Sequence, residues 1–213
     1  MPAVPLSPAT DALLVIDVQV DFCPGGALAV PEGDRVVPLC NHLMAQVSTV
    51  VLTQDWHPPG HVSFASSHGR APFEVIELDY GPQVLWPDHC VQGTAGAAFH
   101  PALNTDPAHV IVRKGMRRQI DSYSAFFEND RRTPTGLAGW LHDKGIKRVL
   151  LCGLATDYCV NYSGQDARAL GFEAVLVEDA CRAVDLDGSR ADALATLRAA
   201  GVTFARTAEI TGA

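Results

Sequence analysis

A cysteine at the start of a predicted helix is the residue of this sequence best placed for covalent chemistry. The run 148–160 reads as a buried strand, a tight turn and then a helix. Because that helix begins at Thr156 or Asp157, Cys159 lies in its first turn, where unpaired N–H groups and the helix dipole favour a thiolate. The same N–H groups could bind an oxyanion. The alternative is a buried, inert cysteine, the state of most intracellular cysteines.

Polar residues also follow three other predicted strands. Asp17, Asp55 and Lys114 each come at the end of a short apolar run. Ligands of open α/β sheets bind beyond the carboxyl ends of the strands, so we expect these groups at one edge. Taken alone, Asp17 could be a turn former and Lys114 a solvated charge. Together, Asp17, Lys114 and Cys159 make a site where carboxylate and ammonium keep each other charged and the thiol passes its proton to the carboxylate.

A second group of residues has the composition of a metal site. Asp55 and His57, two positions apart at an extended strand end, can face the same way. The Pro-Pro-Gly turn that follows can bring back His61, and His89 in a second turn could complete the set. Such a set suits one divalent ion, Zn²⁺, Fe²⁺ or Mn²⁺, with open positions for water or substrate. The alternative is that these loop histidines are solvated, and for Cys90 we favour a structural role over ligation.

The elements that must position these residues alternate along the chain. Runs rich in Val, Ile and Leu predict strands buried on both faces, at 12–17, 49–53, 110–113, 148–153, 174–178 and 202–205. Amphipathic segments between them predict helices, at 32–47, 135–144, 157–170 and 187–200. Gly145 and Gly171 fall where helix C-caps belong. The alternation predicts a parallel sheet with helices on both faces.

Length and composition favour one globular domain over 1–213, with a loop insertion at about 55–105 that is rich in Pro, Gly, His and Ser. The net charge of −8 argues against nucleic acid or an anionic membrane as a partner. No apolar run is long enough to span a bilayer, and the N-terminus has no pattern of a secretion signal. Six scattered cysteines without a CxxC pair indicate a reducing, cytoplasmic environment.

Six motifs, in order over about 13–184, resemble a known family. They are Asp17-Val-Gln-Val-Asp-Phe22, Asp55-Trp-His-Pro-Pro-Gly-His61, Trp86-Pro-Asp-His-Cys-Val-Gln-Gly93, Arg113-Lys-Gly115, Asp121-Ser-Tyr-Ser-Ala-Phe126 and Gly153-Leu-Ala-Thr-Asp-Tyr-Cys159. The family is that of the isochorismatase-like cysteine hydrolases, and the resemblance is to its nicotinamidase/pyrazinamidase members. The acid, amine and thiol motifs are shared widely in that superfamily, whereas the metal motif is more particular to nicotinamidases. The one departure, Ala95 in place of an expected proline, is peripheral.

This resemblance implies a three-layer α/β sandwich with a six-stranded parallel sheet. It also implies metal-dependent hydrolysis of nicotinamide, and of pyrazinamide, through a cysteine thioester. Cys159 is then the nucleophile, Asp17 its proton acceptor and Lys114 the orienting cation. The metal ligands implied are Asp55, His57, His61 and His89. The family also carries a cis peptide, here between Leu154 and Ala155.

A mechanism on these lines assigns further residues to the substrate. Phe22, Trp86 and Tyr123 would supply apolar walls for the ring, while the metal holds the pyridine nitrogen. The N–H groups of Ala155 and Cys159 would face the carboxamide oxygen and stabilise the oxyanion. The expected partner is therefore a small molecule, nicotinamide, and a homo-oligomer is compatible with the sequence.

Two other functions compete with this one. A related cysteine hydrolase acting on an N-carbamoyl or ureido substrate would keep the thiol, acid and amine without needing a metal for a ring nitrogen. A non-catalytic metal-dependent binding module would use Cys159 only for packing. An oxidoreductase is disfavoured because no predicted strand is followed by a GxGxxG loop.

Overall fold

Six parallel strands form the central sheet of this protein, for which a computed structural model describes residues 3–211. Their spatial order is β6-β3-β2-β7-β8-β9. The strands are β2 Asp11–Ile16, β3 Val50–Asp55, β6 Val110–Lys114, β7 Arg148–Leu154, β8 Glu173–Arg182 and β9 Thr203–Ala205. All neighbours pair in parallel, so the carboxyl ends of all six strands lie at the same edge.

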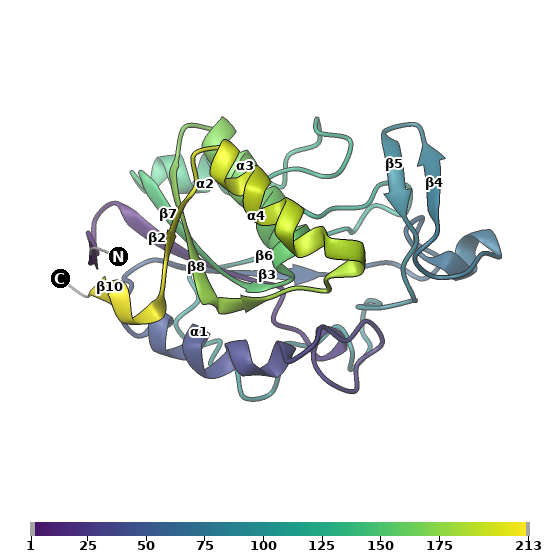
Figure 1. Cartoon of the computed structure of the whole chain (residues 1–213), viewed down its shortest axis with the longest axis horizontal. Coiled ribbons are helices and arrows are strands. Elements are labelled where there is room, and N and C mark those ends of the chain that lie inside the picture. Colours follow the sequence, from purple (N-terminus) through teal and green to yellow (C-terminus); the bar gives the residue numbers. More distant parts are fainter. Residues whose placement is uncertain (1–2, 212–213) are drawn as a thin grey trace.

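Helices cover both faces of this sheet, as Figure 1 shows. Helix α1 (Val36–Met44) lies on one face. The other face carries α2 (Leu137–Asp143), α3 (Asn161–Ala169) and α4 (Ser189–Ala199). Gly145 and Gly171 follow α2 and α3 as predicted. The predicted three-layer α/β sandwich is therefore confirmed, although each helix is shorter than the amphipathic segment that predicted it.

The edge strands differ from their prediction. β2 and β3 are buried along their whole length, as expected for strands covered on both faces. β6 alternates between buried and more exposed residues, with Ile111 49% exposed, and β9 has one buried residue of three. The reason is that α1 contacts β2, β7 and β8 in the middle of the sheet and β6 lies beyond it. An apolar run alone does not distinguish a central strand from an edge strand.

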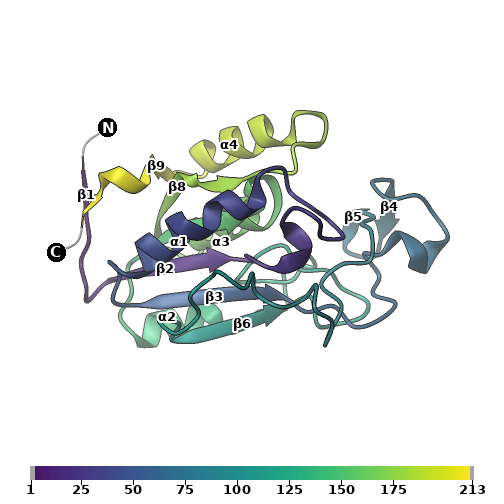
Figure 2. The ribbon, with the colours of Figure 1, turned by 90° about the horizontal axis from the view of Figure 1, so that it is seen from below.

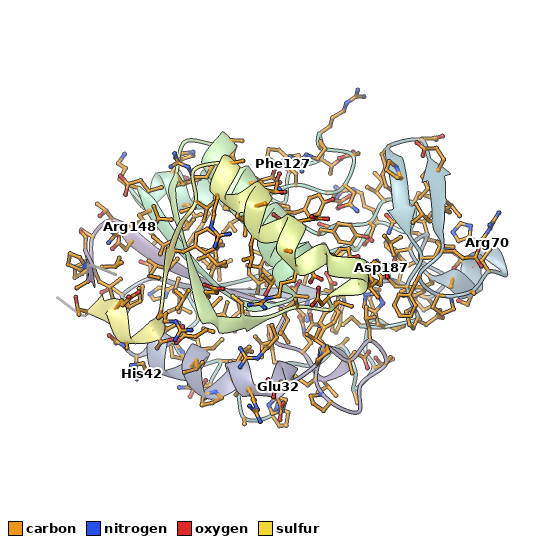
Figure 3. All side chains as sticks on the ribbon, viewed as in Figure 1. Glu32, His42, Arg70, Phe127, Arg148 and Asp187 are labelled. Carbon is orange, nitrogen blue, oxygen red and sulfur yellow. The ribbon has the colours of Figure 1, made fainter. Side chains whose placement is uncertain are left out.

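The predicted insertion carries small elements of its own. A 3₁₀ turn spans Ala65–His68, and β4 (Val75–Leu78) and β5 (Gly81–Val84) form an antiparallel hairpin. Figures 1 and 2 show this hairpin at one end of the molecule. The two termini lie at the opposite end, where β1 (Val4–Pro5) pairs with β10 (Ile210–Thr211). Figure 3 shows Arg70, just before the hairpin, pointing away from the body of the protein.

The order of the strands fixes where a ligand can bind. Counted along the chain, the six strands run 3-2-1-4-5-6 across the sheet, so the winding reverses between β2 and β7. Open α/β sheets bind ligands beyond the strand ends at this reversal. Asp17 directly follows β2, and Cys159 lies in the turn that follows β7. Within residues 3–211, no helix combines the length and the apolar character that crossing a membrane requires.

Only glycine is predicted to fit at position 153, near the carboxyl end of β7. The φ of Gly153 is +112°, and an added Cβ would lie 2.1 Å from the carbonyl oxygen of Ile16, its paired residue in β2. Gly153→Ala should therefore lower the free energy of unfolding by about 3 kcal/mol or more, measured by urea denaturation. The control Gly139→Ala, exposed in α2 with open space around the new methyl group, should instead stabilise by up to about 1 kcal/mol. Wild-type stability of Gly153→Ala would contradict this account.

Candidate active site

The buried ammonium of Lys114 is the point where four strand ends meet. Its Nζ donates to Asp55 Oδ1 and, at 2.9 Å, to the carbonyl of Ser122. The same Nζ lies 2.8 Å from Asp17 Oδ2 and 3.3 Å from Cys159 Sγ. Asp55 and Lys114 are paired residues of β3 and β6, so both side chains leave the sheet on the same face. The structure therefore brings together the acids, the amine and the thiol expected at this edge.

One ammonium serves two carboxylates in this cluster. Burial disfavours the charged form of Lys114, but Asp17 and Asp55 outweigh it and raise the pKa of Lys114 well above its usual range. Burial also opposes the charge of Asp55, but Lys114 and the nearby His57 lower the pKa of that carboxyl. For Asp17, burial outweighs the attraction of Lys114, and its pKa is raised. Asp17 is therefore the carboxylate better suited to take a proton.

The carboxyl group of Asp17 is held at one oxygen and open at the other. The Asp17 N–H donates to Thr53 Oγ1 (3.1 Å), and the Thr53 hydroxyl donates to Asp17 Oδ1 (2.6 Å). In the part of the chain that the structure describes, Oδ2 accepts no hydrogen bond, so its approach to Lys114 is an ionic contact. A carboxylate oxygen of Asp17 lies within 4.8 Å of Cys159 Sγ. Asp17 is thus placed to receive the proton of the thiol.

Cys159 lies in a helical turn, but its thiol is not ionised by that turn. The segment Thr156–Val160 is a π-helical turn that follows β7 and leads into α3, so the helix begins where it was predicted. The Leu154–Ala155 peptide is cis, as the resemblance implied. The direction differs from the expectation of a stabilised thiolate: burial raises the pKa of Cys159 more than the nearby Lys114 lowers it, and Asp17 and Asp55 raise it further.

Asp55 also faces two histidines on its other side. Its Oδ2 lies 3.6 Å from His57 Nε2 and 4.0 Å from His89 Nε2, and donor atoms of the three residues lie within 4.8 Å of one another. His57 Nδ1 contacts the Gly115 carbonyl (3.0 Å) and His89 Nδ1 the Pro87 carbonyl (2.8 Å). Each ring that donates from Nδ1 turns the lone pair of Nε2 toward Asp55, the usual arrangement of a metal-binding histidine.

His61 lies outside this group, which differs from its prediction as a fourth ligand. Its Nδ1 lies 2.7 Å from Ser63 Oγ and its Nε2 3.2 Å from the Ile120 carbonyl, so both ring nitrogens have partners. The ring stacks on that of His57, with centroids 4.2 Å apart. With His57 and Asp121 it forms a second group whose donor atoms lie within 4.8 Å of one another. In this arrangement His61 packs behind the ring of His57.

Sequence reasoning missed two residues that position the histidines. The fully buried ring of Phe64 lies edge-on to His57 and His61 at 5.6 Å and to His89 at 5.7 Å. A Cβ at Gly115 would lie 2.4 Å from Cε1 of His57, so only glycine admits that ring at its hydrogen-bonding distance. Gly115 could have been found from its place directly after Lys114. Phe64 carries no signal that separates it from other core aromatics.

Two further residues brace the loops around the site. Cys90 is buried, and its carbonyl accepts the N–H of His57 at 3.0 Å, which is the structural role expected of it. Asp157 lies in the same turn as Cys159 and accepts the Val184 N–H (3.1 Å) and the Ser189 hydroxyl (2.6 Å). Asp157 therefore connects the turn that carries Cys159 to the segment that leads into α4.

A cavity opens beside the thiol of Cys159 and the imidazole of His89. All four residues predicted to touch the substrate line it: Phe22, Trp86, Tyr123 and Ala155. Asp55, His89 and Cys159 line it too, so the cavity touches the sulfur and one imidazole, that of His89. The lining also contains four residues that sequence reasoning did not assign, namely Leu28, Asp121, Tyr158 and Val184.

Comparison with known proteins agrees with this geometry. Residues 11–209 match the isochorismatase domain. The chain belongs to the isochorismatase family. Among curated members of that family, the nicotinamidase of Acinetobacter baylyi is 53% identical over 192 residues, which cover 90% of each chain. The resemblance to nicotinamidases and pyrazinamidases found in the motifs is therefore confirmed.

Solved structures of isochorismatase-family proteins share the fold closely. The nicotinamidase/pyrazinamidase of Acinetobacter baumanii is 50% identical with a TM-score of 0.94, covering 96% of this chain and 99% of its own. PnC1 from L. infantum, in complex with nicotinate, is 42% identical with a TM-score of 0.88, covering 99% and 100%. The pyrazinamidase of Pyrococcus horikoshii, in complex with zinc, is 36% identical with a TM-score of 0.75, covering 92% and 98%.

Removing the central cation is predicted to destabilise this protein as well as to inactivate it. Lys114→Met leaves the buried carboxylates of Asp17 and Asp55 facing each other, which should cost about 3–5 kcal/mol of unfolding free energy. Lys144→Met, at an exposed lysine, is the matched control and should change stability by no more than about 0.5 kcal/mol. Urea denaturation of both variants measures the difference, and equal stability would show that the ion cluster does not hold the strand ends together.

Proposed function

We propose that this protein is a nicotinamidase that hydrolyses nicotinamide, and pyrazinamide, to the carboxylic acid and ammonia. One observation carries the proposal: a single cavity is lined by the thiol of Cys159, whose Sγ lies 3.3 Å from the Lys114 ammonium, and by Asp55 and His89 of the Asp-His-His cluster. The bond broken is an amide, and the pyridine nitrogen is meta to the carboxamide on the ring. The family membership and the nicotinamidase names of close relatives support the same activity.

The residues of the Asp-His-His cluster fit one divalent metal ion, Zn²⁺, Fe²⁺ or Mn²⁺. Asp55, His57 and His89 would hold it, through one carboxylate oxygen and two Nε2 atoms, a donor set suited to these ions. Burial is the largest effect that lowers the pKa of His89, to about 4, which favours the neutral form that binds metals. The ion would supply a Lewis-acid contact for the pyridine nitrogen of the substrate. The zinc complex of the Pyrococcus horikoshii relative supports a metal of this kind.

In the first half of the proposed reaction, Cys159 Sγ attacks the carboxamide carbon while its proton passes to Asp17. The new C–S bond gives a tetrahedral oxyanion, which the N–H groups of Ala155 and Cys159 would stabilise; one such donor is typically worth about 3 kcal/mol. Asp17 then returns the proton to the departing nitrogen, the C–N bond breaks and ammonia leaves. The raised pKa of Asp17 suits a group that takes up and returns a proton. A thioester to Cys159 remains.

In the second half, water attacks the thioester and gives up a proton to Asp17. The C–S bond breaks, nicotinate is released and the thiol of Cys159 regains its proton. Lys114 stays charged throughout and holds Asp17 and Cys159 within reach of each other. Phe22, Trp86 and Tyr123 would hold the ring so that the carbonyl carbon stays over the sulfur.

The activity is tested by ammonia release from nicotinamide, with pyrazinamide and N-carbamoylsarcosine as comparison substrates. The metal-loaded enzyme should prefer nicotinamide, and Cys159→Ala should lose more than about a thousandfold in kcat/KM because no other group can form the acyl intermediate. Circular dichroism of the variant should match the wild type. Preference for the N-carbamoyl compound would support the related hydrolase function, and an active Cys159→Ala would refute the nucleophile.

Metal analysis of purified variants tests the proposed ligands separately from turnover. Asp55→Ala, His57→Ala and His89→Ala should each lose the bound ion, because each removes one of three donors. His42→Ala, at an exposed histidine of α1, is the control and should retain the ion. His61→Ala decides between the two placements of that residue. Retention of the ion fits packing behind His57, whereas stoichiometric loss would show that His61 turns from Ser63 to bind.

A further inference from the structure

Gln83 is a buried polar residue in a hairpin that is otherwise exposed or half-exposed. The residues of β4 and β5 other than Gln83 are exposed or partly exposed, whereas Gln83 is 1% exposed. Burying an amide costs free energy unless its donors and acceptor are all used. An apolar side chain could pack the hairpin against the body of the protein without the cost of desolvating a polar group. The contacts of this amide therefore need an explanation.

Two of the residues that Gln83 contacts line the cavity. The two N–H groups of Gln83 Nε2 are shared among three acceptors: Asp121 Oδ2 at 2.8 Å, the Tyr123 phenol oxygen at 3.1 Å and the Val84 carbonyl at 2.7 Å. Its Oε1 accepts the Tyr80 hydroxyl at 3.0 Å. Asp121 and Tyr123 both line the cavity, and Gln83 itself is not among the lining residues.

The phenol oxygen of Tyr123 is the point where two segments meet. It accepts Gln83 Nε2 from the hairpin and, at 3.0 Å, Nε1 of Trp86 from the loop that follows. The rings of Trp86 and Tyr123 stand edge to face, at 81° with centroids 6.4 Å apart, and Trp86 meets Tyr158 at 4.7 Å and 88°. Since a phenol oxygen offers two lone pairs, both are used by these N–H donors. The orientation of the aromatic wall therefore depends on Gln83.

We propose that Gln83 is a positioning residue for substrate binding, an inference that rests on the proposed nicotinamidase function. Its amide fixes Tyr123, and through the shared phenol oxygen Trp86, so that the aromatic wall is already in place when the ring enters. A wall fixed in advance costs less conformational entropy on binding. Gln83 makes no contact with the reacting groups: Lys114, Asp17 and Cys159 are held by their own contacts. Its loss should therefore weaken binding of the ring and leave the chemical step largely unchanged.

Steady-state kinetics of the metal-loaded enzyme test this assignment. Gln83→Met keeps the length and volume of the side chain and removes its hydrogen bonds. KM for nicotinamide and Kd for nicotinate should rise about tenfold, the value of one hydrogen bond of ordinary strength, while kcat changes less than about threefold. Glu77→Gln, at an exposed residue of β4 in the same hairpin, is the control and should leave KM, Kd and kcat unchanged.

The double variant separates positioning from a general effect on the hairpin. Tyr123→Phe removes the phenol oxygen, so it should raise KM by itself, and Gln83→Met should then add little further increase. If the increases in KM caused by Gln83→Met and Tyr123→Phe simply multiply in the double variant, the proposal is overturned. A fall in kcat of Gln83→Met at unchanged KM would overturn it as well. If Gln83→Met fails to fold, Tyr123→Phe decides the matter, because an unchanged KM in that variant refutes the role of the shared oxygen. A wild-type enzyme that releases no ammonia from nicotinamide would refute the proposed function instead.

Discussion

The buried ammonium of Lys114 is the constraint on which the rest of the site depends. Three acidic groups surround this single cation, namely the carboxyls of Asp17 and Asp55 and the thiol of Cys159. One positive charge cannot keep all three ionised in a buried environment, and burial raises the pKa of both Cys159 and Asp17. In the proposed mechanism this cluster passes the thiol proton to Asp17, a carboxylate oxygen of which lies within 4.8 Å of the sulfur.

Asp55 connects the Lys114 cluster to the Asp-His-His cluster. One of its oxygens faces Lys114 and the other faces His57 and His89, so a single side chain at the end of β3 belongs to both clusters. In the proposed reaction, the register of β3 with β6, in which Asp55 pairs with Lys114, would help to set the distance between the metal ligands and the sulfur. Rigid strands can hold that spacing more accurately than loops. The topology explains the placement, because β2 and β7 flank the reversal of the winding and supply the acid and the thiol.

Much of this site could be read from the sequence because its residues follow strands. Asp17, Asp55 and Lys114 each end an apolar run, and the alternation of strands and helices fixes the edge at which they meet. The direction of the pKa shift at Cys159 could not be read, since it depends on burial and on Asp17 and Asp55, which come from other strands. The exposure of β6 and the packing of His61 against His57 depend likewise on neighbours that are distant in sequence. Periodicity reports the local element and does not report what lies across from it.

The two ends of the cavity are built in different ways, and this difference explains why the hairpin matters. The acid, amine and thiol groups lie on strands or just beyond strand ends: Asp55 and Lys114 end β3 and β6, Asp17 directly follows β2, and Cys159 lies in the turn after β7. Trp86 and Tyr123, which line the cavity, come from loops; the backbone of Trp86 is hydrogen-bonded to that of Ser63 and Ala65, but the orientation of the two rings is left to side-chain contacts. Edge-to-face aromatic contacts tolerate small rotations, whereas hydrogen bonds to one phenol oxygen do not. A buried amide on β5 that donates to that oxygen supplies the directional contact that the packing of rings alone lacks.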